Sequence, residues 1–122
     1  MKLKTPLRYP GGKSRAVPKL LQHLPSREIT EYREPFLGGG SMAIEMTRRL
    51  PEEIPIWVND LYEPLYNFWV QLRDNGDYLH SELMRAKNFH PDEESARKLF
   101  LDSKENLNDS KRSQEDRAVD FY

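Results

Sequence analysis

The chain has 122 residues and no cysteine, which limits it to one domain with a modest core and excludes a disulfide framework or a thiolate metal site. No apolar run reaches the roughly 18 residues of a membrane span and no signal peptide begins the chain, so we expect a cytoplasmic protein without a membrane partner. Residues 1–50 hold ten Lys/Arg against four Asp/Glu, whereas residues 51–122 hold nine against sixteen. A basic first part suits a polyanion, although unevenly spread surface charge gives the same count.

A loop over residues 7–14 comes first, because Pro10 and two glycines interrupt any regular element. A helix should follow to about Leu24, with Ser14 as its cap. The Gly-Lys-Ser run of this loop is similar to a triphosphate-binding loop, but that pattern requires glycine where the chain has Leu7. The sequence therefore argues against a nucleoside triphosphatase.

A strand, a glycine turn and a helix are predicted next. The strand covers residues 29–36, the turn is Gly38 to Gly40, and the helix begins at Ser41, which is expected to be only a cap. A turn without Cβ atoms lets a ligand approach the main chain, and the following helix points free N–H groups at it. Such a junction favours a carboxylate or a phosphate.

A second strand is predicted over residues 55–59, and it ends at Asp60. Together with the preceding strand and helix it forms a β-α-β unit of about 30 residues. In that architecture an acidic side chain about 20 residues beyond the glycines binds ribose hydroxyls. The alternative is that Asp60 caps the next helix, which Pro64 would help to open.

The rest of the chain is predicted to be helical. We expect a helix over residues 61–75 that ends before Gly76, weaker helices over 78–88 and 91–101, and a last helix capped by Ser113. The three histidines are scattered and lack clustered carboxylates, so no metal site is predicted.

Three motifs in this order resemble the amino-terminal part of the Dam-type (D12 class) N6-adenine DNA methyltransferases. They are Tyr9-Pro10-Gly11-Gly12-Lys13, then Glu34-Pro35-Phe36-Leu37-Gly38-Gly39-Gly40-Ser41, and then Val58-Asn59-Asp60. The resemblance covers roughly residues 6–75. It implies S-adenosylmethionine as cofactor and double-stranded DNA as partner.

The resemblance also assigns roles to single residues. Tyr9 would lie against the adenine, Lys13 would contact the cofactor, and Asp60 would hold the ribose hydroxyls. Phe36, Gly38 and Gly40 would shape the pocket floor. Arg8 occupies the place of a basic residue that touches a DNA base in some members, although a solvated arginine is the default explanation.

No catalytic residue is assigned. The family places the flipped adenine against a [D/N]-P-P-[YFW] motif, and no Pro-Pro occurs in the 122 residues. Only two strands are predicted, and the chain stops on an apolar run, Ala118 to Tyr122. We therefore expect an incomplete Rossmann-like, S-adenosylmethionine-dependent methyltransferase fold of the α/β class, truncated before the catalytic motif and inactive alone.

The expected organisation is a partial cofactor-binding domain over residues 1–76 and a helical segment over 77–122 that leads towards an absent target-recognition region. Exposed apolar side chains would then favour self-association, with Trp57, Phe68 and Trp69 as candidates, unless these residues fill a small helical core. Two alternative functions remain at this stage. One is a small DNA- or protein-binding regulatory module, and the other is a methyltransferase for RNA or a small molecule.

Overall fold

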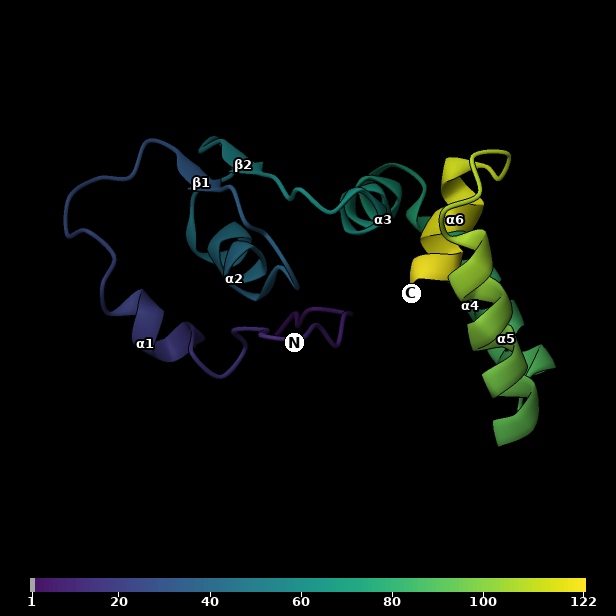
Figure 1. Ribbon diagram of the computed structural model, residues 1–122. Helices are drawn as coiled ribbons and strands as arrows, with labels where there is room; N and C mark the ends of the chain where they lie inside the picture. The colour runs from purple at the N-terminus through teal and green to yellow at the C-terminus, as the bar shows by residue number, and fades with distance from the viewer. Residues whose placement is uncertain (1) are drawn as a thin grey trace. The chain divides into compact units, whose positions relative to one another are not determined.

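A computed structural model describes residues 2–122. The chain forms two compact units, of which the first ends at Leu61 and the second is Tyr62–Tyr122. The first unit contains α1 (Val17–Leu21), β1 (Tyr32–Glu34), α2 (Ser41–Arg49) and β2 (Ile56–Val58) (Figure 1). None of the helices among the described residues has the length and the apolar character that crossing a membrane requires.

Strands β1 and β2 lie side by side and parallel, with Arg33 opposite Trp57 at the centre of the register. Helix α2 joins them and packs against β2, which confirms the predicted β-α-β unit. Both strands are shorter than predicted. Strand β1 ends at Glu34 because the next residue is Pro35, which has no N–H to donate to the ladder. The pairing resumes two residues after Pro35, where the Leu37 N–H donates to the Asn59 carbonyl at 2.9 Å.

The core of the first unit is the contact between α1 and α2. Val17 from α1 and Met42 and Met46 from α2 are buried there. The predicted helix over this region is correct in kind but too long, and its predicted cap is wrong. The N-cap of α1 is Ala16, which makes no side-chain bond, and the Ser14 hydroxyl instead lies 2.8 Å from the Ser41 hydroxyl.

The second unit is entirely helical among its described residues. It contains α3 (Glu63–Asp74), α4 (Gly76–Phe89), α5 (Glu93–Asn106) and α6 (Gln114–Phe121). The four predicted helices are confirmed, and the predicted cap of the last one is too, since the Asp116 N–H donates to the Ser113 hydroxyl at 3.1 Å. The N-cap of α3 is Tyr62, so the alternative of Asp60 as that cap is wrong. The predicted division of the chain after Gly76 stays a prediction.

Helix α6 contacts each of the other three helices in the second unit. Ala118 is buried on it, and the small side chain allows close approach. Phe68 of α3 is 1% exposed, with its ring centroid 5.6 Å from that of Phe121 and 5.9 Å from that of Tyr122. Phe68 therefore belongs to the helical core, and its alternative role as a self-association surface is wrong. Trp57 in the first unit is 49% exposed, and its role in self-association stays a prediction.

A hydrogen bond joins α4 to α6 and makes the stability of the second unit depend on pH. The Tyr78 hydroxyl donates to the Asp116 carboxylate at 2.7 Å, which raises the pKa of Tyr78 from 10.0 to about 12. The same bond lowers the pKa of Asp116. The bond requires a protonated phenol and an ionised carboxylate, so its contribution is complete at neutral pH and is lost as the pH rises from 10.0 to about 12.

We expect the free energy of unfolding of wild type to exceed that of Tyr78→Phe at neutral pH, and this difference to shrink between pH 10.0 and about 12. Urea titrations of both proteins across this range measure the difference. A difference that stays constant through the range would show that the bond does not contribute.

Candidate cofactor pocket

The glycine turn between β1 and α2 has a backbone conformation that residues with a side chain rarely adopt. Gly38 has a φ of 54° and Gly40 a φ of 70°, both in the left-handed region that favours glycine. Gly40 is also the N-cap of α2, and its N–H donates to the Leu37 carbonyl at 3.0 Å. The N-cap of α2 is therefore not Ser41, and the prediction that Ser41 acts only as a cap is wrong.

Tyr9 packs directly on this turn. A Cβ atom added at Gly39 would lie 3.1 Å from the Tyr9 Cβ, and one added at Gly38 would lie 3.4 Å from the Tyr9 ring. The loop that carries Tyr9 is itself fixed, because the Gly12 N–H donates to the Tyr9 carbonyl at 2.9 Å and the Thr5 hydroxyl donates to the Gly39 carbonyl. The motif that contains Tyr9 therefore packs against the motif that contains the glycine turn.

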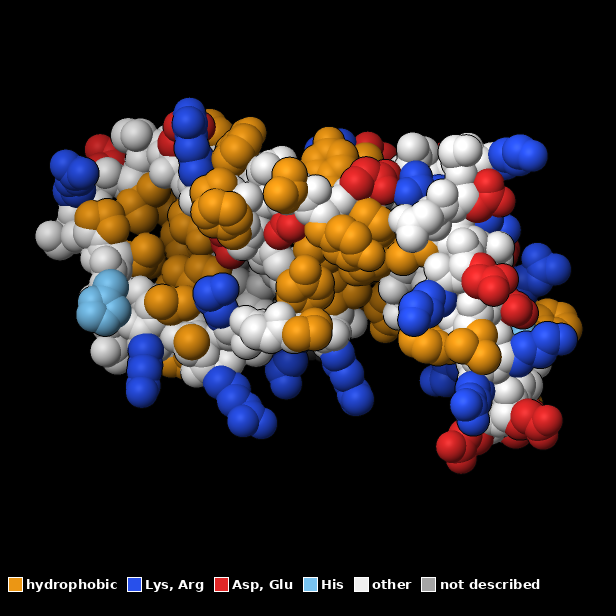
Figure 2. Space-filling model, in the orientation of Figure 1, with side chains coloured by type: hydrophobic (Ala, Val, Ile, Leu, Met, Phe, Trp, Pro, Cys, Tyr) orange, Lys and Arg blue, Asp and Glu red, His pale blue; other side chains and the backbone are white. Residues whose placement is uncertain are grey.

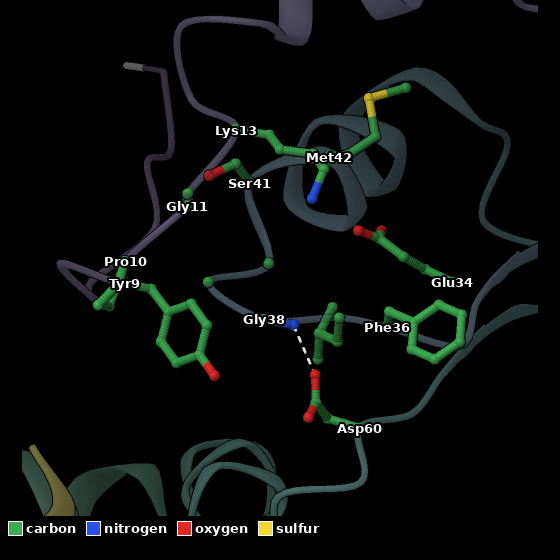
Figure 3. Close-up of a pocket in the computed structure, with 14 residues that line it drawn as sticks. Tyr9, Pro10, Gly11, Lys13, Glu34, Phe36, Gly38, Ser41, Met42 and Asp60 are labelled. Carbon is green, nitrogen blue, oxygen red and sulfur yellow. Dashed lines mark hydrogen bonds between the residues drawn. The ribbon is translucent and has the colours of Figure 1, made fainter.

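Asp60 of the third motif, which follows the end of β2, contacts the same turn. The Gly38 N–H donates to a carboxylate oxygen of Asp60 at 2.9 Å (Figure 3). A carboxylate has roughly four lone-pair positions, so it can accept several hydrogen bonds at once. Asp60 can therefore orient the turn and also accept hydrogen bonds from a ligand.

The Glu34 carboxylate lies near the start of α2 and points towards the end of the Lys13 side chain (Figure 3). Burial raises its pKa, against the opposing effects of a hydrogen bond from the Tyr32 hydroxyl at 3.0 Å, the charge of Lys13 and a bond from the Ala43 backbone. A carboxylate at a helix amino terminus is favoured by the helix dipole. Sequence reasoning assigned no role to Glu34, although its place beside Pro35 and Phe36 in the second motif was a usable signal.

These groups surround a single cavity of about 190 Å³. It is lined by all six residues predicted to bind the cofactor, which are Tyr9, Lys13, Phe36, Gly38, Gly40 and Asp60. Phe36 lines it with 81% of its surface exposed, so it lies at the rim. Pockets for drug-sized ligands span roughly 300–1,000 Å³, so we expect a complete ligand to extend beyond this cavity. Arg8, predicted to touch DNA, is exposed and lies outside the lining.

The described residues contain no group of three or more His, Cys, Asp or Glu side chains able to hold a metal ion. The pocket offers two aromatic rings, two carboxylates, an ammonium group and a bend in the main chain. This set suits a ligand with an aromatic base, hydroxyl groups and a zwitterionic end.

The family model for D12 class N6 adenine-specific DNA methyltransferases matches residues 9–122. The chain belongs to this family.

A curated relative is the Type II methyltransferase M.MjaIII of Methanocaldococcus jannaschii. It is 26% identical over 117 residues, which cover 91% of this chain. The same match covers 40% of the relative, so the chain spans about two fifths of the length of that protein.

Proposed function

We propose that this chain is the S-adenosylmethionine-binding part of a site-specific DNA adenine-N6 methyltransferase. The observation that carries the proposal is that Tyr9 and Asp60, from two separate motifs, both contact the glycine turn beside one cavity. When bound, the cofactor supplies the methyl group. We assign the chain's own residues to holding it, and none of them to the transfer.

The residues present fit the cofactor at both of its ends. At the adenosine end, the Tyr9 ring offers a face for the adenine and Asp60 accepts hydrogen bonds from ribose hydroxyls. At the methionine end, Lys13 and Glu34 have charges opposite to the ligand's carboxylate and ammonium groups. The carboxylate of Glu34 is already bonded to the first turn of α2. We therefore assign the ligand's carboxylate to Lys13 rather than to the helix end alone.

The wider proposal follows from family membership. The β-α-β unit is the first part of a Rossmann-like methyltransferase fold, and residues 77–122 lead towards the part that recognises the DNA target. The partner is double-stranded DNA and the compartment is the cytoplasm. Because no Pro-Pro occurs in the 122 residues, we expect no methyl transfer by this chain alone.

Calorimetry with S-adenosylhomocysteine tests the pocket. Asp60→Asn keeps an oxygen that can accept the Gly38 N–H but replaces a carboxylate oxygen with a donor, so the ribose loses an acceptor. Hydrogen bonds to charged groups contribute about 1.5–3 kcal/mol, so we expect affinity to fall roughly 10- to 100-fold.

The matched control is Asp102→Asn, which removes the same charge from an exposed position in α5 and should bind like wild type. No binding by wild type, or equal affinity in Asp60→Asn, would contradict the proposed pocket.

A further inference from the structure

The first segment of the chain has cations and no anions. The first 27 residues contain seven Lys/Arg and no Asp or Glu. Within the part of the chain that the structure describes, six of these cations are exposed and form no ion pair: Lys4, Arg8, Lys13, Arg15, Lys19 and Arg27. Later arginines in the same unit differ, since Arg33 pairs with Glu31 at 3.1 Å and Arg49 pairs with Glu45 at 2.7 Å.

This segment is held in a fixed position relative to the pocket. Lys4 precedes Thr5, whose hydroxyl donates to the Gly39 carbonyl in the glycine turn. On the other side of the loop, the Val17 N–H donates to the Lys13 carbonyl at 3.0 Å and the Val17 side chain is buried. The exposed cations on both sides of the pocket loop therefore hold a defined place beside the cavity.

Figure 2 shows Lys and Arg side chains projecting along one edge of the first unit, where Figure 1 has α1 and the N-terminal segment. No Asp or Glu side chain interrupts this row in that view. Arg15 lies in the turn before α1, and Lys19 lies within α1. The protein itself does not neutralise these charges, so an external polyanion is the natural partner.

We propose that Lys4, Arg15 and Lys19 bind the phosphate backbone of duplex DNA beside the cofactor pocket. The inference rests on the proposed function, which identifies the polyanion as DNA. Phosphate contacts from lysine and arginine fix the register of a protein on the duplex and carry no base sequence. These three residues therefore hold the duplex at the pocket, and they do so for any base sequence. They act apart from Arg8 and Lys13, which adjoin or line the cavity.

Salt dependence of duplex binding tests the surface. Each phosphate contact contributes about 0.9 to the slope of log affinity against log salt concentration. For the triple variant Lys4→Gln, Arg15→Gln and Lys19→Gln we therefore expect a slope shallower by about 2.7 than that of wild type. The variant leaves the pocket lining intact, so it should bind S-adenosylhomocysteine with wild-type affinity.

The matched control is Arg97→Gln, Lys98→Gln and Lys104→Gln, which removes the same charge from exposed positions of α5. Its slope should equal that of wild type, because α5 also has acidic residues at 93, 94, 102 and 105. Equal slopes for the two triple variants, or a wild-type affinity for duplex DNA that is independent of salt, would contradict the proposal that this surface binds DNA. If the slopes differ while S-adenosylhomocysteine fails to bind wild type, the cofactor proposal fails and the basic surface stands.

Discussion

Phe68→Ala is expected to lower the free energy of unfolding by about 3–5 kcal/mol, the usual cost of removing a buried aromatic side chain. Phe68 is 1% exposed, and its ring lies against those of Trp69, Phe121 and Tyr122. Truncation leaves a cavity between α3 and the end of α6, the two helices of this unit with the most extensive contact. Domains of this size have a total stability of about 5–15 kcal/mol, so this loss is a large part of it.

Urea denaturation followed by circular dichroism measures the change. Phe100→Ala is the matched control, because Phe100 lies on α5 with 65% of its surface exposed and should cost no more than about 0.5 kcal/mol. Similar losses in the two variants would show that the aromatic cluster is not the core of the second unit.

Gly38→Val is expected to abolish binding of S-adenosylhomocysteine. Gly38 has a φ of 54°, a conformation that costs an ordinary residue about 1–2 kcal/mol and a β-branched residue more. The added Cβ would lie 3.4 Å from the Tyr9 ring, and its two methyl groups reach further into that ring. Relief of this strain moves the Gly38 N–H away from Asp60 and Tyr9 away from the turn, so two proposed ligand contacts change together.

Calorimetry should detect no binding by Gly38→Val at ligand concentrations that saturate wild type. Gly76→Ala serves as the control because a Cβ there meets nothing within 4 Å and Gly76 begins α4 in the second unit. Circular dichroism on both variants establishes that the helices persist. Retained binding by Gly38→Val would mean that the glycine turn does not form the ligand site.

The β-α-β unit, the glycine turn and the place of Asp60 could be predicted because their signals are local in the sequence. Each signal occupies a few consecutive positions of the sequence. They are the glycines that later prove to have positive φ, the acidic residue after a strand, and the glycine loop with an aromatic residue. Tyr9, Lys13 and Phe36 were assigned to the pocket because the three motifs, in this order, resemble those of the D12 family. Helix positions in the second unit were likewise marked by local signals such as the Ser113 cap.

Other features depend on tertiary contacts that no short pattern encodes. Glu34 acquires its role from burial and from bonds to the Tyr32 hydroxyl and the first turn of α2. Ser14 and Ser41 each resemble a helix cap locally, but their hydroxyls pair with each other across 27 positions of sequence. Phe68 is buried because it meets Phe121 and Tyr122 at the other end of the unit's sequence.

The central claim is that Tyr9, the glycine turn and Asp60 hold one molecule of the methyl donor. Nuclear Overhauser contacts between the isotopically labelled chain and S-adenosylhomocysteine test it most directly. We expect the adenine protons to contact the Tyr9 ring and the ribose protons to contact Gly38 and the Asp60 methylene group. Adenine contacts confined to residues outside the pocket lining, or no contacts at all at saturating ligand, would contradict the account.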